Sequence, residues 1–321
     1  MIIVTGGAGF IGSNIVKELN NRGRSDILIV DNLGKSEKYK NLIGLHYLDY
    51  IHKEKFFSDL NNFNADVEAI FHEGACSDTM EYDVNYMMKN NFETSKQLLK
   101  FCDSKKIPFI YASSASTYGG GKNGFTEGDK FEDALNPYAF SKLTFDRYVR
   151  NFLKNSSTKI IGLKYFNVFG PQEIHKGKMA SIFYQLYKQI KTTGIAKLFK
   201  GIDGYGDGEQ RRDFIYVKDV VKINLWAMEN DIKNGIYNCG TGQAHTYNES
   251  AQAVINALGK GRIEYIDFPE TLKGKYQNYT QADTAQLINA GYNGGFTDFN
   301  SAVKEYCEIL ERNGGYYSYV D

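Results

Sequence analysis

The chain has 321 residues, of which 42% are hydrophobic and 24% are charged, values typical of a globular protein long enough for two domains. Its 38 basic side chains equal its 38 acidic ones, so no overall field attracts nucleic acid or an anionic membrane surface. No apolar run is long enough to cross a bilayer and no signal sequence precedes the first strand, so we expect a cytoplasmic protein. The four cysteines lie far apart without zinc spacing, so we expect no metal.

Short apolar runs alternate with longer amphipathic stretches through the first half of the chain. The runs that predict strands are Ile2–Val4, Ile27–Val30, Ala69–His72, Phe109–Ala112 and Ile160–Tyr165. Helical periodicity is found at Ile11–Asn21, Met87–Ser104 and Pro137–Leu153. This alternation is typical of a parallel sheet with helices on both faces, and it predicts a doubly wound α/β fold.

A glycine-rich turn follows the first predicted strand and opens the first helix. Gly6, Gly9 and Gly12 have the spacing that lets a backbone approach a pyrophosphate closely at a helix N-terminus. Asp31 ends the second strand, about 20 residues further on, where an acidic side chain accepts hydrogen bonds from the adenosine ribose. Together these features predict a dinucleotide-binding domain of the Rossmann type.

The residues around the ribose site leave the choice between NAD and NADP open. Asp31 favours NAD because a carboxylate binds the free 2′-hydroxyl and repels a 2′-phosphate. Lys35, Lys38 and Lys53 follow in the sequence, and any of them can neutralise a 2′-phosphate.

The second half of the chain is less regular and rich in glycine. Ile215–Val217 and Ile236–Cys239 are predicted as strands that return to the main sheet. We therefore predict that residues 1–168 form the dinucleotide-binding domain, with 215–240 and 297–312 returning to it. Residues 169–214 and 241–296 are predicted as a smaller α/β substrate domain.

Tyr138 and Lys142 are the candidate catalytic pair. Four residues apart on a helix, they lie on one face, one turn from each other. A tyrosine titrates near pH 10, so its use as a base near pH 7 needs about 4 kcal/mol of stabilisation of the phenolate, which an adjacent ammonium group supplies. The same spacing occurs at Tyr118–Lys122, Tyr184–Lys188 and Tyr187–Lys191.

Position favours Tyr138 over the other pairs. Its helix begins with Asn136 as N-cap and Pro137 in the first turn, a strong start signal. This helix also follows the fifth strand and its serine-rich loop, in which Ser114 is the candidate hydroxyl for holding the reacting oxygen.

These motifs, together with Tyr165–Pro171, resemble the extended short-chain dehydrogenase/reductase family over nearly the whole chain. Dehydratases of that family usually carry an Asp-Glu pair directly after the serine or threonine of the fifth-strand loop, whereas this chain has Ala115 and Ser116. The resemblance therefore implies epimerisation or simple oxidoreduction rather than dehydration.

Three further segments, His72–Ser77, Glu173–Ser181 and Leu272–Gln277, resemble the ADP-heptose 6-epimerase branch of that family. This resemblance implies inversion at carbon six of ADP-D-glycero-D-manno-heptose through a transient ketone, with tightly bound NADP, in a homo-oligomer, a pentamer by analogy. Inversion needs either a proton acceptor and donor on each face of the transient ketone or rotation of the substrate. The resemblance assigns Lys176 to the second face. The residues alone leave Lys176 open as an ordinary surface lysine.

The resemblance also implies the remaining contacts. Besides the glycines, Asp31, Lys142 and Lys176, it places on the cofactor Phe10, Ile11, Asn32, Lys38, Lys53, Glu73, Gly74, Ala75, Cys76, Ser77, Asn90 and Val168. It places near the nucleotide-sugar substrate Asn167, Lys178, Gln185, Phe199, Lys200, Gly201, Ile202, Arg212 and Tyr276. Arg212 suits a diphosphate, and its alternative is an ion pair with Asp213.

The sugar pocket departs from the pattern of that branch at some positions. Lys178 replaces a small serine, Gln185 replaces a histidine, and the loop over 203–210 is longer. Two alternatives therefore stay open: an epimerase or reductase of another nucleotide sugar, and a non-catalytic dinucleotide sensor on the same fold.

Overall fold

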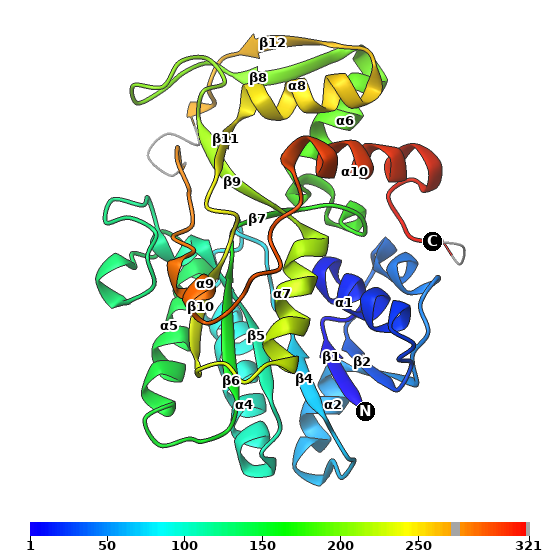
Figure 1. Ribbon diagram of the computed structural model, residues 1–321, viewed down its shortest axis with the longest axis vertical. Helices are drawn as coiled ribbons and strands as arrows, with labels where there is room; N and C mark the ends of the chain where they lie inside the picture. The colour runs from blue at the N-terminus through cyan, green and yellow to red at the C-terminus, as the bar shows by residue number, and fades with distance from the viewer. Residues whose placement is uncertain (271–276, 319–321) are drawn as a thin grey trace.

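The computed structural model describes residues 1–270 and 277–318. Its larger part is a seven-stranded sheet in which all neighbouring strands run parallel. Figure 1 shows this sheet in the lower half of the molecule, with a smaller lobe above it. From one edge to the other, the strands are β10 (Gly235–Cys239), β6 (Ile160–Tyr165), β5 (Phe109–Ser114), β4 (Ala69–His72), β1 (Ile2–Thr5), β2 (Ile27–Asp31) and β3 (Asp49–His52).

The strand order reverses between β1 and β4. The chain adds β2 and β3 outward on one side of β1, then crosses back and adds β4, β5, β6 and β10 on the other side. In parallel sheets the crevice outside the carboxyl ends of the strands, at such a switch point, is where ligands bind. The predicted doubly wound fold is confirmed.

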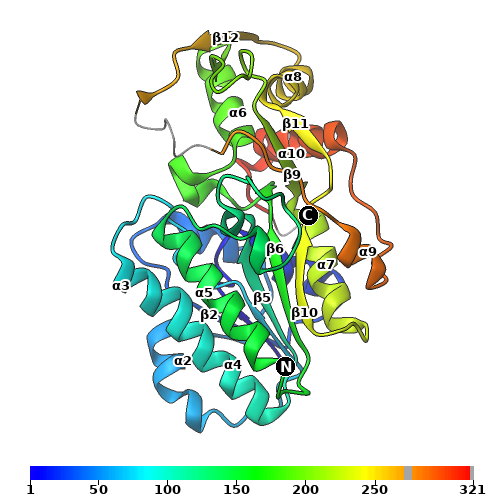
Figure 2. The same cartoon turned by 90° about the vertical axis from the view of Figure 1, so that its left-hand side faces the viewer.

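Helices cover both faces of the sheet because the strands are apolar on both sides. Every residue of β1, β2, β4 and β6 is buried, as expected of a parallel sheet. One face is covered by α1 (Phe10–Asn21), α7 (Val217–Glu229) and α9 (Ala285–Asn289). Figure 2 shows on the other face α2 (Lys53–Asp59), α3 (Val84–Met87), α4 (Thr94–Lys105) and α5 (Pro137–Phe152).

A π-helical turn, η3 (Met88–Glu93), joins α3 to α4 in one continuous helical segment. Such a wider turn is uncommon and is often found at functional sites. The 3-10 helices are η1 (Glu37–Leu42), η2 (Leu60–Asn62), η4 (Ala115–Tyr118), η5 (Asp129–Phe131) and η6 (Ile174–Met179).

The smaller lobe contains two short sheets and three helices around its own apolar core. One sheet pairs β12 (Arg262–Ile266) with β8 (Ile195–Phe199), and the other has the order β11 (Ala244–Thr246), β9 (Arg211–Tyr216) and β7 (Asn167–Phe169). The helices are α6 (Ile182–Thr193), α8 (Tyr247–Leu258) and α10 (Phe299–Asn313). Phe183 and Tyr306 are fully buried in this core.

Some predicted elements lie elsewhere than expected. The strand predicted over 215–217 does not join the main sheet. Its first two residues end β9, which pairs with β7 and β11, and Val217 begins α7. The apolar residues do not reveal this, because β9 is nearly as buried as the strands of the main sheet. Helix α10 packs against α8 and β9. Strand β3 was not predicted, since its exposed sequence at the sheet edge lacks an apolar run. Among the described residues, no helix is both long and apolar enough to span a bilayer.

A buried network of charges fixes α5 against the sheet. Asp146 accepts hydrogen bonds from Tyr111 (3.0 Å), Ser113 (2.6 Å) and Lys164 (2.6 Å). Lys164 also lies 3.0 Å from Glu132, and both side chains are fully buried. The network joins α5 to β5 and β6, directly beneath the loop that carries Ser114.

We expect Asp146→Asn to lower the free energy of unfolding by about 3 kcal/mol, because it leaves the buried Lys164 ammonium without one of its two counter-charges. The matched change Asp59→Asn removes an exposed ion pair with Lys55 and should leave stability nearly unchanged. Urea unfolding of both variants measures the difference. Equal stability of the two variants would contradict this role of Asp146.

Candidate active site

A hollow of about 1260 Å³ lies at the carboxyl edge of the sheet, at the switch point between β1 and β4. The structure brings together in its wall all the predicted catalytic and cofactor residues: Gly6, Gly9, Phe10, Ile11, Gly12, Asp31, Asn32, Lys38, Lys53, Glu73, Gly74, Ala75, Cys76, Ser77, Asn90, Ser114, Tyr138, Lys142, Val168 and Lys176. They come from segments separated by up to 170 positions, so only the fold assembles them.

The glycine loop fits a pyrophosphate. Gly6 has φ +68°, and a Cβ there would lie 2.6 Å from the backbone nitrogen of Gly74. A Cβ at Gly12 would lie 2.2 Å from the carbonyl oxygen of Gly6, so neither position tolerates a side chain. Gly9 begins α1 without a side-chain cap, and phosphate oxygens can therefore accept hydrogen bonds from the N–H groups of its first turn.

The ribose end of the hollow combines one carboxylate with two ammonium groups. The Asp31 carboxylate accepts a hydrogen bond from the backbone N–H of Ala8 (2.9 Å) and pairs with the Lys38 ammonium at 2.6 Å. Lys53 donates to the side-chain oxygen of Asn90 at 2.9 Å. The negative charge of Asp31 is thus neutralised by Lys38 before any cofactor binds, while Lys53 adds a further positive charge.

Tyr138, Ser114 and Lys142 meet at the other end of the hollow. Ser114 forms a hydrogen bond with Tyr138, but burial outweighs it and raises the pKa of the phenol. Lys142 is buried and donates to the carbonyl oxygen of Ala112 at 2.8 Å. Burial lowers the pKa of Lys142 to about 8, against the opposing effects of Glu73 and Asp146. The ammonium therefore lies close to its own titration range at neutral pH.

Lys176 enters the same hollow from η6. Its ammonium lies 5.2 Å from the ring centroid of Phe10, above the start of α1. Burial lowers the pKa of Lys176, although the carboxylate of Glu173 opposes this. Burial thus makes this amine easier to deprotonate than an exposed lysine.

Asn41 holds the Lys176 segment against the glycine loop, and it was not predicted from the sequence. Its fully buried amide donates to the carbonyl oxygens of Ala8 (2.9 Å) and Gln172 (3.0 Å), and it lies 3.1 Å from Nδ1 of His175. Gln172 has φ +75°, a strained value for this residue type. Because these residues are distant in sequence, no local pattern reveals the contact.

Asn91 is a second residue that the sequence did not identify. Its side chain accepts from the N–H of Cys76 (2.8 Å) and donates to the carbonyl oxygen of the same residue (2.9 Å). It also donates to Ser141 (3.0 Å), whose hydroxyl donates to the carbonyl oxygen of Tyr138. One buried amide therefore joins the β4 loop to the helix of the catalytic pair.

The predicted substrate residues that the structure describes are not among the residues lining this hollow. Asn167 is exposed, and its side-chain oxygen lies 3.2 Å from the hydroxyl of Thr280. Lys178 is exposed, and Gln185 donates to the carbonyl oxygen of Gly177. Phe199, Lys200, Gly201 and Ile202 follow one another at the end of β8, far along the chain from the catalytic pair. Tyr276 lies outside the described residues.

Arg212 is buried in β9 and lies over the ring of Tyr247, 5.8 Å from its centroid. The carboxylate of Asp213 accepts hydrogen bonds from the N–H groups of Thr241, Gly242 and Ala282. Asp213 thus orders the β10–β11 and 280–283 loops, a structural role that the sequence did not predict.

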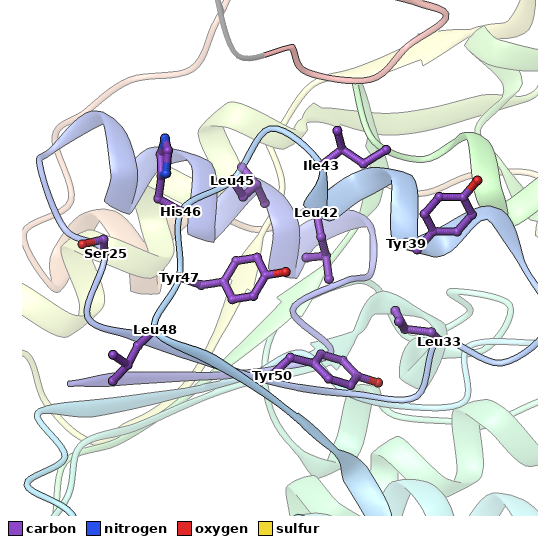
Figure 3. A pocket seen from close by; sticks show the side chains of 10 residues that line it. All are labelled: Ser25, Leu33, Tyr39, Leu42, Ile43, Leu45, His46, Tyr47, Leu48 and Tyr50. Carbon is purple, nitrogen blue, oxygen red and sulfur yellow. The ribbon is translucent and has the colours of Figure 1, made fainter.

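A second hollow lies beside η1 and β3, at the edge of the main sheet (Figure 3). Its wall is partly polar and partly apolar and is formed by Ser25, Leu33, Tyr39, Leu42, Ile43, Leu45, His46, Tyr47, Leu48 and Tyr50. Of the predicted site residues that the structure describes, none belongs to this wall, whereas the predicted catalytic and cofactor residues line the hollow at the switch point.

Comparison with known proteins agrees with this geometry. The model of the NAD dependent epimerase/dehydratase family matches residues 2–240. ADP-L-glycero-D-manno-heptose-6-epimerases from Brachyspira hyodysenteriae and Alkalilimnicola ehrlichii are 54% and 52% identical to this chain, over 98% and 97% of it and 99% and 97% of their own lengths. The structure of the Helicobacter pylori ADP-L-glycero-D-manno-heptose-6-epimerase superimposes with a TM-score of 0.83 at 33% identity, covering 97% of this chain and 96% of that one.

The resemblance inferred from the motifs is thereby confirmed, and the cofactor is a nicotinamide dinucleotide. The matched region contains the glycine loop, the Ser114 loop, the Tyr138–Lys142 pair and Lys176. With these residues in one hollow on a doubly wound sheet, and with relatives above 50% identity over nearly the full length, the chain belongs to the NAD dependent epimerase/dehydratase family.

Proposed function

We propose that this protein converts ADP-D-glycero-D-manno-heptose to ADP-L-glycero-D-manno-heptose by inverting carbon six, with tightly bound NADP. The observation that carries the proposal is the presence of Tyr138 and Lys176, from two separate segments, in the wall of one dinucleotide-shaped hollow. The high identity to enzymes of that name supports the substrate. A homopentamer in the cytoplasm follows from the family resemblance and stays a prediction.

Without rotation of the substrate, inversion through a ketone uses a proton carrier on each face. The bound dinucleotide supplies reversible hydride acceptance, so that the substrate alcohol is oxidised and later reduced on its opposite face. Either Tyr138 or Lys176 removes the hydroxyl proton as the ketone forms, and the other residue returns a proton to the oxygen when the alcohol is restored. Exchange of protons with solvent then restores both residues, so the net reaction consumes neither reductant nor protons.

The surroundings of Tyr138 explain how a phenol can take part near neutral pH. Burial raises its pKa in the protein alone, so it needs positive charge close by to become a phenolate. Lys142, one helical turn away, supplies an ammonium group, and Ser114 supplies a hydrogen bond to the same oxygen. Ser114 is also placed to hold the substrate oxygen beside Tyr138.

We also propose NADP as the dinucleotide. Lys38 forms an ion pair with the Asp31 carboxylate, which would otherwise accept a hydrogen bond from a ribose hydroxyl. Lys53 lines the same hollow. Two ammonium groups beside one neutralised carboxylate favour a 2′-phosphate.

Purified protein is expected to epimerise ADP-D-glycero-D-manno-heptose without added reductant, and proton NMR of the product measures this. Tyr138→Phe should lower kcat by about 10²–10⁴-fold because it removes one proton carrier, while dinucleotide binding stays intact. A stoichiometric requirement for NADPH, or turnover only with other nucleotide sugars, would contradict the proposed reaction.

Lys176→Met is expected to lower kcat by at least about 10²-fold, since one face of the ketone then lacks its proton carrier. Steady-state kinetics give kcat and KM separately, and the loss should fall on kcat. Lys188→Met is the matched control, because Lys188 is exposed on α6. A Lys176 variant as active as this control would show that Tyr138 serves both faces of the ketone and that the substrate rotates in the site.

Lys38→Met is expected to reverse part of the cofactor preference. It removes a positive charge from the 2′-phosphate and frees Asp31 to accept from a ribose hydroxyl. NADP affinity should fall about tenfold, or by about 1.4 kcal/mol, while NAD affinity stays equal or rises. Calorimetric titration with both dinucleotides measures this, with Lys35→Met as the neighbouring control. An equal loss for both would place Lys38 away from the ribose.

A further inference from the structure

Glu73 is an acidic side chain that the reaction proposed above does not use. It follows β4 directly, and the peptide between Glu73 and Gly74 packs against Gly6 at the centre of the switch point. Its carboxylate accepts a hydrogen bond from the Tyr165 hydroxyl at 2.9 Å. Both residues line the hollow, and the Glu73 carboxylate and the Lys142 ammonium act on each other electrostatically, which assigns Glu73 to the catalytic end.

The polar surroundings of Glu73 hold it without neutralising it fully. Tyr165 shares its hydroxyl with Asn224 of α7, whose amide donates back to it at 2.9 Å. The Lys142 ammonium of α5 is the positive group that lowers the pKa of the Glu73 carboxyl. In turn, the negative charge of Glu73 raises the pKa of Lys142, of Tyr138 on the same helix and of Cys239 on β10. His72, on the same strand, is hydrogen-bonded to Thr5 and Ser95 on the far side.

The charge of Glu73 responds to its surroundings near neutral pH. Burial raises its pKa to about 7, although the Tyr165 hydrogen bond and the Lys142 ammonium lower it. A carboxyl group poised in this way ionises when a positive charge arrives beside it and takes up a proton when that charge disappears.

We propose that Glu73 is a charge-compensating residue which favours the oxidised, positively charged nicotinamide over the reduced, neutral one. The proposal rests on the dinucleotide site proposed above, and it assigns to Glu73 the redox preference of that site. An epimerase must finish each cycle with its cofactor oxidised, so a fixed carboxylate at the nicotinamide end opposes release of the substrate as a ketone.

The proposal has a defined dependence on pH. The oxidised cofactor lowers the pKa of Glu73, whereas the reduced cofactor leaves it near its value in the protein alone. The ratio of affinities, oxidised to reduced, therefore rises with pH between the two pKa values and is constant on either side. Since Glu73 has a pKa of about 7, the rise should lie at and below pH 7. Lys142 has a pKa of about 8, which the oxidised cofactor also lowers, so it adds a rise of its own at and below pH 8.

Glu73→Gln tests the idea while keeping the size of the side chain and a partner for Tyr165. The full-length protein is incubated with mixtures of NADP⁺ and NADPH, or of NAD⁺ and NADH if those are bound. Free dinucleotide is then removed by rapid gel filtration and both bound forms are measured. The bound oxidised fraction relative to the reduced should fall about tenfold at pH 7.5. Its rise at and below pH 7 should become smaller by the part that Glu73 contributes, which leaves the part from Lys142.

Glu54→Gln is the matched control, because Glu54 lines the ribose end of the same hollow and should leave both the ratio and its pH dependence unchanged. Tyr165→Phe keeps the carboxylate but removes its hydrogen bond, so the rise should move to higher pH while the preference above it persists. Circular dichroism establishes that each variant is folded.

An unchanged ratio and an unchanged pH profile in Glu73→Gln would overturn the proposal. If that variant does not fold, an unmoved profile in Tyr165→Phe overturns it instead. The readout is dinucleotide binding, so it stands apart from turnover. If the epimerase assay fails but Glu73→Gln changes the binding ratio as expected, the proposed substrate is rejected and the redox role of Glu73 stands. If the protein epimerises the substrate but Glu73→Gln leaves the ratio unchanged, only the role of Glu73 is rejected.

Discussion

The carboxylate of Asp146 is the contact on which the active geometry depends. Tyr138, Lys142 and Asp146 follow at four-residue intervals on α5, so they share one stripe of the helix. The last of them is held to β5 and β6 by Tyr111, Ser113 and Lys164. A rotation of α5 that moved the catalytic pair would have to break this buried network. The cost of leaving the buried Lys164 ammonium without the Asp146 carboxylate opposes such a rotation. The same hydrogen bonds fix the strand end from which Ser114 projects.

The second constraint is the approach of two distant segments at the switch point. Gly6 and Gly74 leave no space for a side chain between them, and Asn41 joins the glycine loop to the segment that carries Lys176. The two proposed proton carriers thus reach the hollow from opposite sides of the same loop. One is supported by a helix of the main sheet and the other by a short turn, so their relative position depends on how the smaller lobe sits on the larger.

The sequence was sufficient for the fold class, the glycine loop and the Tyr138–Lys142 pair, because these depend on local signals. Most other residues of the hollow, Lys176 among them, were indicated only by the family resemblance. Strand and helix periods, the glycine spacing and the N-cap at Asn136 are each contained within a few residues. The assignments that failed depend on long-range pairing. The end of β9 is as apolar as a strand of the main sheet, and only its pairing with β7 and β11 distinguishes it. Likewise, Asn41 and Asn91 act through partners far away in the sequence, and single asparagines carry no pattern.

The π turn at η3 determines which side of its helix faces the sheet. On a regular α-helix, the eight steps from Met87 to Ser95 cover two turns and about 80° more, which would carry the later side chain well out of line. The wider turn absorbs this excess, and Met87, Asn91 and Ser95 are all buried. Two polar side chains, Asn91 and Ser95, therefore lie on the buried face of the helix. Ser95 is hydrogen-bonded to His72, and Asn91 accepts a hydrogen bond from the backbone N–H of Cys76. The irregular helix thereby places a buried amide, Asn91, where it binds both backbone groups of Cys76 in the loop after β4.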